Sequence, residues 1–90
     1  MFDILYHDEV VSKDLPKIDS EWKEVIRLAI ESKLMTDPVT YGKPLRRSLK
    51  NYRKLRVGDY RVVFSIQKQN GKVFVIQHRS KVYSTASKRR

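Results

Sequence analysis

The chain has 90 residues, of which 40% are hydrophobic and 10% aromatic, so it can fold but only as one small domain, expected over residues 1–90. It contains no cysteine, which excludes a disulfide framework, a zinc knuckle and a thiol nucleophile. No apolar run approaches the roughly 18 residues of a membrane span, and the N-terminal segment Met1-Phe2-Asp3 lacks the positive charge of a signal peptide. We therefore expect a soluble, cytoplasmic protein with no membrane partner.

The net charge of +10 is concentrated in the second half of the chain. Residues 1–40 hold five Lys and Arg against nine Asp and Glu, whereas residues 41–90 hold fifteen Lys and Arg against one acid, Asp59, a balance of +14. Self-repulsion of this size destabilises a compact state, which indicates a partner of opposite charge. Nucleic acid and an acidic protein are the two candidates, and a simply solvated basic surface is the alternative.

The N-terminal half predicts one strand followed by two helices. Residues 2–6 alternate loosely and form the strand, and residues 8–15 form a short helix that a proline ends. Asp19 or Ser20 then supplies an N-cap for a second helix over residues 21–34. Its helically spaced apolar residues are expected to face the core: Trp22, Val25, Ile26, Ala29, Ile30 and Leu34.

After a loop at residues 41–44, the hydrophobic period changes from helical to strand-like. The predicted strands are 52–57, 60–66 and 72–76. Tight turns are expected at Gly58-Asp59 and at Asn70-Gly71, and the latter dipeptide is typical of hairpins. The tail from residue 80 to 90 holds a short helical turn. The predicted fold is α+β with the order β-α-α-β-β-β, an antiparallel sheet and two N-terminal helices packed on one face.

Strand geometry groups several basic residues on one face of this sheet. Residues two apart in a strand share a face, so Lys54 and Arg56 project together. The turn at Gly58-Asp59 brings Arg61 on the next strand close to them. Because the helices cover one face, we expect the other face to be open and to carry these cations.

The residue types favour RNA chemistry without a metal or a cofactor. The basic half offers only Asp59 as a carboxylate, and no glycine-rich phosphate loop is present. His7 is interpreted as a surface residue, since no spacing links it to His78. Aromatic residues accompany the cations: Tyr52, Tyr60, His78 and Tyr83. Such a surface binds single-stranded RNA through phosphate contacts and stacking, or cleaves it by aligning the 2′-hydroxyl and stabilising the added charge on phosphorus.

Three segments of the basic half resemble the RelE/ParE family of toxins of type II toxin–antitoxin systems. They are Lys-Pro-Leu at 43–45, Tyr-Arg-Lys-Leu-Arg-Val-Gly-Asp-Tyr-Arg-Val-Val-Phe at 52–64, and His-Arg-Ser-Lys-Val-Tyr at 78–83. The resemblance spans essentially the whole chain. It implies a compact, microbial RNase-like fold, in agreement with the predicted order of elements.

For RelE-type members, the resemblance implies an endonuclease that cuts mRNA in the ribosomal A site and leaves a 2′,3′-cyclic phosphate and a 5′-hydroxyl. Lys54 then contacts the phosphate or polarises the nucleophile, and Arg61 stabilises the transition state. Arg79 is a second phosphate-binding residue, and Tyr83 orients the scissile region. The remaining expected RNA-binding residues are Tyr52, Arg53, Arg56, His78 and Lys81.

One departure from the family pattern leaves the general base unassigned. Some members carry a second lysine two residues before Lys54, where this chain has Tyr52. Arg53 points to the opposite face unless a bulge intervenes. Tyr52, His78 or another group then takes the proton. His78 and Arg79 are neighbours in a strand, so both face the site only if the strand is irregular.

Two other functions remain open at the level of sequence. A ParE-type member poisons DNA gyrase as a protein binder without nuclease activity, and a plain RNA-binding domain neither cleaves nor kills. Either toxin implies an antitoxin with an acidic binding segment, and a heterotetramer if that antitoxin dimerises. The RelE-type function adds the ribosome and mRNA as partners.

Overall fold

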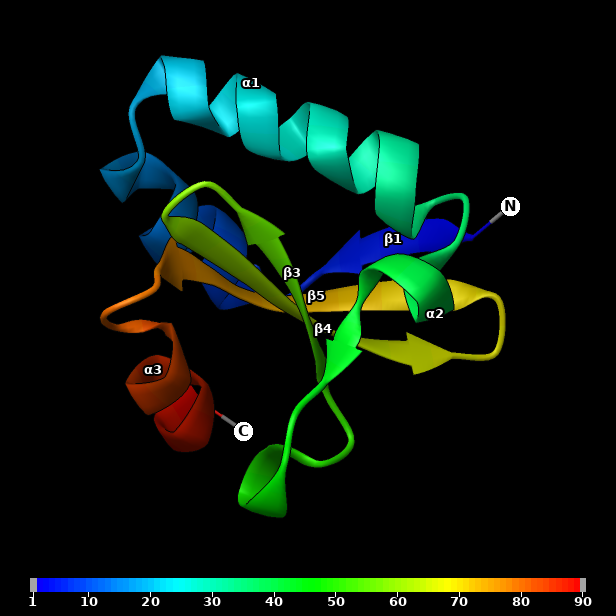
Figure 1. Ribbon diagram of the computed structural model, residues 1–90. Coiled ribbons are helices and arrows are strands. Elements are labelled where there is room, and N and C mark those ends of the chain that lie inside the picture. Colours follow the sequence, from blue (N-terminus) through cyan, green and yellow to red (C-terminus); the bar gives the residue numbers. More distant parts are fainter. Residues whose placement is uncertain (1, 90) are drawn as a thin grey trace.

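The computed structural model describes residues 2–89 and forms one five-stranded sheet in the order β1-β5-β4-β3-β2, with helices on both faces (Figure 1). The strands are β1 (Asp3–Tyr6), β2 (Lys43–Pro44), β3 (Arg53–Val57), β4 (Tyr60–Gln67) and β5 (Asn70–His78). The predicted α+β class is confirmed, and β3, β4 and β5 are antiparallel neighbours as expected. The first strand instead runs parallel to β5, which is possible because helices connect β1 to the rest of the sheet.

The first helical layer contains most of the N-terminal half. It comprises the π-helical turn η1 (Val10–Asp14), the 3-10 turn η2 (Leu15–Lys17), α1 (Ser20–Ala29) and its π-helical continuation η3 (Ile30–Leu34). The expected N-cap is confirmed, since Asp19 Oδ1 accepts a hydrogen bond of 3.0 Å from the backbone N–H of Trp22. Ile26, Ile30 and Leu34 are buried as predicted, whereas Val25 lies 46% exposed on the solvent side of α1.

The strand residues that face α1 form the larger core. In β3 and β4 these are the alternate apolar residues Leu55, Val57, Val62 and Phe64. Alternation then places the intervening side chains of β3 and β4 on the opposite face. This arrangement fixes which basic residues lie away from α1.

The second face of the sheet is partly covered, in contrast to the open face expected from the sequence. The C-terminal helix α3 (Val82–Arg89) lies on the side of the sheet opposite α1 (Figure 1). Its Val82 and Ala86 are fully buried and pack against Val63, Phe74 and Val75. These strand residues are apolar on the second face too, so that face needs a cover to exclude water.

A β-bulge explains why two consecutive residues of β5 face α3. Val63 pairs with Val75 but Phe64 pairs with Val73, so Phe74 is the extra residue of the bulge. Both Phe74 and Val75 belong to the core cluster under α3. Beyond Phe74, the alternation of β5 is therefore shifted by one residue relative to a regular strand.

The β4–β5 hairpin does not turn at Asn70-Gly71 as predicted. Gln67 pairs with Asn70, so the turn residues are Lys68 and Gln69, and Lys68 has a φ of 57°. Gly71 lies within β5 beside Ile4 of β1, where an added Cβ would come within 3.0 Å of the Ile4 side chain. The glycine thus allows β1 to approach, rather than forming the turn.

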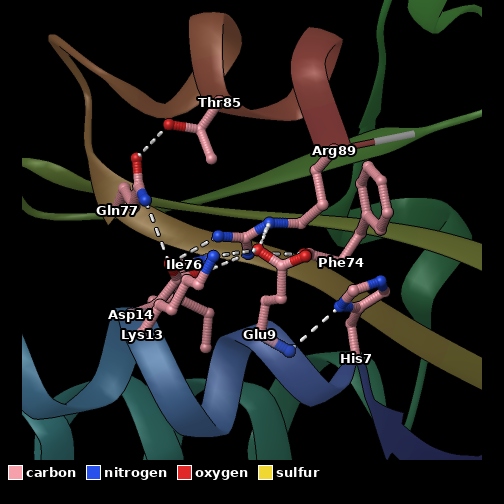
Figure 2. A network of polar contacts seen from close by, with 9 residues as sticks. All are labelled: His7, Glu9, Lys13, Asp14, Phe74, Ile76, Gln77, Thr85 and Arg89. Carbon is pink, nitrogen blue, oxygen red and sulfur yellow. Dashed lines mark hydrogen bonds and ion pairs between the residues drawn. The ribbon is translucent and has the colours of Figure 1, made fainter.

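An ion pair between Asp14 and Arg89 covers the edge of β5 beyond the residues that pair with β1. Pairing with β1 ends at Val73. Beyond it, the Asp14 carboxylate accepts a hydrogen bond of 2.9 Å from the Ile76 backbone N–H, and the Arg89 guanidinium donates one of 3.1 Å to the Phe74 carbonyl. Asp14 and Arg89 bind each other through two contacts of 2.8 and 3.0 Å (Figure 2). The pair satisfies backbone groups that would otherwise be buried without partners.

Candidate active site

The structure brings together the three cations that strand alternation predicted to share a face. Arg56 pairs directly with Arg61, and Lys54 pairs with Lys43 of the edge strand β2. A cleft of about 160 Å³ opens at this point. We call it the cationic cleft, and its lining residues are Tyr41, Lys43, Lys54, Arg56 and Arg61.

Four of the five residues that line the cationic cleft are Lys or Arg, and none is acidic. Ion pairs elsewhere in residues 2–89 involve Lys13, Arg27, Arg79 and Arg89 as the cations. None of the cleft cations forms an ion pair in that range. Like charges held this close without counter-ions favour binding of an anion with several oxygens, such as a phosphodiester.

Arg61 is the most rigidly held of these cations, because its side chain is buried and anchored. Only 8% of Arg61 is exposed, and its Nη1 atom donates hydrogen bonds of 2.9 Å to the carbonyls of Gly58 and Tyr60. Gly58, with a φ of 59°, forms the β3–β4 turn, so this predicted turn is confirmed. A guanidinium has five N–H donors, so the donors that do not bind these two carbonyls are available to a ligand in the cleft.

Tyr83 of helix α3 contacts Lys54 but is not itself one of the residues that line the cleft. The ammonium nitrogen of Lys54 lies 5.8 Å from the centre of the Tyr83 ring, within the range of a cation–π interaction. Tyr83 is half-buried and packs beside the core under α3. The two residues predicted to contact phosphate and to orient the scissile region are thus neighbours.

Two of the predicted RNA-binding residues have structural roles. The Tyr52 ring is stacked on Phe74, with 5.0 Å between the ring centres, and packs against the core under α3. Arg53 points to the face opposite Lys54, as predicted, and donates hydrogen bonds of 2.8 and 3.4 Å to the carbonyls of Gly42 and Val39. These bonds hold in place the segment around helix α2 (Pro38–Tyr41), which carries Tyr41 of the cleft.

Three further predicted residues, His78, Arg79 and Lys81, also lie outside the lining of the cationic cleft. His78 lies on the α1 side of the sheet, where its ring meets the edge of Tyr60 at 6.1 Å. Arg79 is in the turn after β5 and is 61% exposed, with its Nε atom 3.9 Å from Asp59 Oδ1. The exposed Lys81 also follows β5, next to helix α3. The structure therefore does not bring Arg79 into contact with the cleft cations.

Three residues near the cleft were missed by the sequence analysis. Tyr41 and Lys43 line it, yet the segment 41–44 was interpreted as a loop because a two-residue strand leaves no periodic signal. Gln77, rather than His78 or Arg79, is the β5 residue paired with Arg61. The bulge at Phe74 moves Gln77 to the cleft face, and nothing in the sequence marks that bulge.

The chemistry available in the cleft is charge stabilisation and proton transfer by amines and phenols. The groups are the ammonium ions of Lys43 and Lys54, the guanidinium ions of Arg56 and Arg61, and the Tyr41 hydroxyl. Among residues 2–89, no group of three His, Asp or Glu side chains is arranged to hold a metal ion. Within the same range, every helix is too short or too polar to cross a bilayer.

A family model for the ParE toxin of type II toxin–antitoxin systems, parDE, matches residues 5–83 of the chain. The chain therefore belongs to this family, and the predicted membership of the RelE/ParE toxins is confirmed. Among curated protein sequences, none matches the chain.

Solved structures of toxin–antitoxin complexes share the fold. The RelBE2 complex from Mycobacterium tuberculosis contains a chain that is 23% identical, with a TM-score of 0.80, over 88% of this chain and 92% of that chain. For the RelB–RelE complex from Methanococcus jannaschii the identity is 22%, the TM-score 0.69 and the coverage 90% and 96%. For the YoeB–YefM complex from Staphylococcus aureus the identity is 13% and the TM-score 0.69, over 87% of this chain and 97% of that chain. At these identities the likeness shows the RelE-like fold alone.

Proposed function

We propose that this toxin is a ribosome-dependent endonuclease that cleaves mRNA and so inhibits translation. The observation that carries the proposal is the cationic cleft, in which Lys54, Arg56 and Arg61 meet without a carboxylate. A phosphodiester that undergoes attack gains negative charge on its oxygens, and preorganised cations at that position lower the barrier. The volume of about 160 Å³ suits a phosphate group and not a whole nucleotide.

The proposed reaction needs no covalent enzyme intermediate. The 2′-oxygen of the RNA forms a bond to the adjacent phosphorus, and the bond from phosphorus to the 5′-oxygen of the next nucleotide breaks. One proton leaves the 2′-hydroxyl and one reaches the departing 5′-oxygen, giving a 2′,3′-cyclic phosphate and a 5′-hydroxyl. Arg61 is proposed to stabilise the added charge, and Lys54 to contact the phosphate. Tyr83 orients the scissile region beside Lys54.

Geometry limits the choice of proton acceptor. Tyr52 is stacked on Phe74, and His78 lies on the opposite face of the sheet, so neither of the two bases considered from the sequence borders the cleft. The groups that remain near the phosphate are the hydroxyls of Tyr41 and Tyr83, which can relay a proton, and the ammonium ions of Lys43 and Lys54, which can donate one to the departing 5′-oxygen.

A cognate antitoxin is the proposed partner of the resting toxin. The excess of cations in residues 41–90 favours an antitoxin segment rich in Asp and Glu, which would cover the cationic cleft. The structural neighbours from three organisms are complexes of toxin with antitoxin, and one complex from S. aureus is described as heterotetrameric. A heterotetramer is accordingly the proposed form of the inhibited complex.

Inhibition of DNA gyrase is the second candidate function. It is favoured by the family model, which is described as the ParE toxin of the parDE system. Such an inhibitor binds protein and has no need of a phosphate-sized cleft. The two functions therefore differ in whether the lining of the cleft matters for a chemical step.

Primer extension on an mRNA, with and without translating ribosomes, tests the proposal. We expect new 5′ ends only when ribosomes are present, and far fewer of them with Lys54→Ala. Lys72→Ala is the matched control, because it removes one positive charge from β5 near the hairpin end of the sheet. Cuts without ribosomes would indicate a free-standing ribonuclease. No cuts in either reaction, together with loss of gyrase supercoiling activity, would establish the second candidate instead.

A further inference from the structure

A second and larger cavity lies beside the cationic cleft, at the end of β5. It has a volume of about 420 Å³ and opens between η2 and the start of α3. We call it the β5-end cavity. Its lining residues are Asp14, Lys17, Ile18, Tyr60, Ile76, Gln77, His78, Ser80, Lys81 and Thr85.

The only carboxylate in this lining is already neutralised. Asp14 is fully buried and binds the Arg89 guanidinium through both oxygens. Its oxygens also accept hydrogen bonds of 2.9 Å from the Ile76 N–H and 3.0 Å from the Gln77 side-chain amide (Figure 2). The charges left to act on a ligand are those of Lys17 and Lys81, both exposed at the rim. The β5-end cavity therefore favours an anion.

The remaining lining suits a planar ring. Ile18 and Ile76 are buried and apolar, and the rings of Tyr60 and His78 meet edge to face with 6.1 Å between their centres. The Nδ1 atom of His78 accepts from the Ser80 backbone N–H, so the proton of the neutral imidazole is assigned to Nε2. The Tyr60 ring also packs against Trp22, with 5.4 Å between the ring centres, so the His78 imidazole is the more available of the two rings. An aromatic ring with a donor, beside two ammonium ions, is suited to bind an unstacked base and its phosphate.

The two sites have lining residues that are paired on adjacent strands. Arg61 lines the cationic cleft, Gln77 lines the β5-end cavity, and the two residues are direct partners on antiparallel strands. Direct partners have Cα atoms about 4.5–5.5 Å apart. The smaller site accommodates a phosphate, whereas ligand pockets for whole small molecules start at about 300 Å³. The β5-end cavity has lining residues from both faces of the sheet, Gln77 from the cleft face and His78 from the α1 face, so an RNA strand with its phosphate at Arg61 would cross β5 at Gln77 to place a neighbouring nucleotide there.

We propose that the β5-end cavity binds one nucleotide of the same RNA strand, next to the phosphodiester that is cut. Lys17 and Lys81 hold its phosphate, and Tyr60 and His78 contact its base. The proposal rests on the proposed ribonuclease function. It assigns a role in RNA binding to His78 and Lys81 at a site separate from the cationic cleft.

Binding of a short, fluorescein-labelled RNA with 2′-O-methyl riboses tests the proposal, because such an RNA lacks the nucleophile and binds without being cut. Fluorescence anisotropy is measured for the full chain, for Lys17→Ala with Lys81→Ala, and for Lys50→Ala with Lys72→Ala. Both double variants lose two positive charges, but Lys50 and Lys72 do not line the β5-end cavity. We expect the first to weaken binding about tenfold and to reduce the slope of log affinity against log salt by about 0.7, as for one phosphate contact, and the control to change affinity much less.

Equal losses in the two double variants would overturn the proposal, because the cavity lysines would then act only through net charge. Lys54→Ala separates this result from failure of the proposed function. If Lys54→Ala weakens RNA binding while the two double variants lose equal affinity, the cationic cleft still binds RNA and only the nucleotide cavity is rejected. If neither Lys54→Ala nor the cavity variant differs from the unmodified chain, the nucleotide cavity is rejected, and primer extension with ribosomes decides the proposed function separately. Circular dichroism of each variant confirms that the fold is retained.

Discussion

The ammonium nitrogen of Lys54 lies 5.8 Å from the centre of the Tyr83 ring, so helix α3 contacts strand β3 at a residue that lines the cationic cleft. The contact depends on the placement of α3, which is fixed by Val82 and Ala86 in the core and by Arg89 at the edge of β5. The last element of the fold therefore contacts one of the residues that line the cleft. Changes that act on Tyr83, or on the attachment of α3, should alter cleavage.

The Tyr83 ring and its hydroxyl can be tested separately. Tyr83→Phe keeps an aromatic face over Lys54, and Tyr83→Leu removes it. A cation–π contact is worth about 0.5–2 kcal/mol, and each 1.36 kcal/mol corresponds to a factor of ten in rate. We expect Tyr83→Leu to slow ribosome-dependent cleavage roughly 2- to 30-fold, and Tyr83→Phe to retain most of the activity. If the Phe variant is as slow as the Leu variant, the hydroxyl takes part in proton transfer.

Arg61 is expected to be the most sensitive position of the cleft. Arg61→Ala removes a preorganised donor, for which losses of about 10²- to 10³-fold in rate are typical. It also removes the hydrogen bonds to the carbonyls of Gly58 and Tyr60, so a moderate fall in melting temperature should accompany the loss of activity. Arg61→Lys keeps the charge without the planar fork and should recover only part of the rate.

Arg79→Ala provides the comparison that decides whether the family-derived role of Arg79 applies here. Arg79 is exposed and pairs with Asp59 in the turn before β4. Since an exposed ion pair contributes little, we expect no measurable change in stability. Cleavage that falls as far as in Arg61→Ala would mean that Arg79 moves to the scissile phosphate when RNA binds. Cleavage close to the unmodified rate would restrict the catalytic cations to those of the cleft.

The buried pair of Asp14 and Arg89 should contribute strongly to stability. Their side chains are 0% and 4% exposed, so removal of one partner leaves a buried charge, at a cost of about 3–5 kcal/mol. Asp14→Ala should therefore shift the urea midpoint far more than Glu24→Ala, which breaks an exposed pair with Arg27 on α1. Similar midpoints for the two variants would show that Arg89 finds another partner, with Glu9 the nearest carboxylate at 3.5 Å.

Gly58→Ala tests the turn that anchors Arg61. The φ of 59° is unfavourable for any residue with a Cβ, at a cost of about 1–2 kcal/mol. The new Cβ would also lie 2.5 Å from the end of the Trp22 ring. We expect lower stability and slower cleavage, because the Gly58 carbonyl accepts from Arg61. Gly71→Ala is the milder control, since its Cβ would meet the flexible end of Ile4 at 3.0 Å.

The shared face of Lys54, Arg56 and Arg61 could be predicted from the sequence because a regular strand alternates with a period of two. The face on which each β5 side chain lies could not be predicted in this way, because alternation fails at a bulge. A regular β5 would put His78 on the same face as Phe74, whereas the bulge moves Gln77 there and turns His78 toward α1. The prediction for His78 thus depended on one extra residue that leaves no trace in the hydrophobic pattern.

Other differences between the predicted and the observed structure arise where tertiary contacts override a local sequence signal. Asn70-Gly71 is typical of a hairpin turn, but the glycine is used for the close approach of β1. The short C-terminal turn predicted from the tail is a full helix, Val82–Arg89, whose stability comes from packing on the sheet and from Arg89. Long-range partners such as Asp14 for Arg89, 75 residues apart, are invisible to a local pattern.

The Asp37 carboxylate should make the edge of the cleft sensitive to acid. It is the N-cap of α2, which precedes Lys43, and hydrogen bonds from the Thr40 hydroxyl and backbone N–H lower the pKa of Asp37. A carboxyl group whose pKa is lower in the folded state stabilises that state at neutral pH, and the contribution disappears as the pH falls through the folded-state pKa. The melting temperatures of the unmodified chain and Asp37→Ala should therefore differ most at neutral pH and converge in acid. A difference that stays constant with pH would mean that the cap acts without its charge.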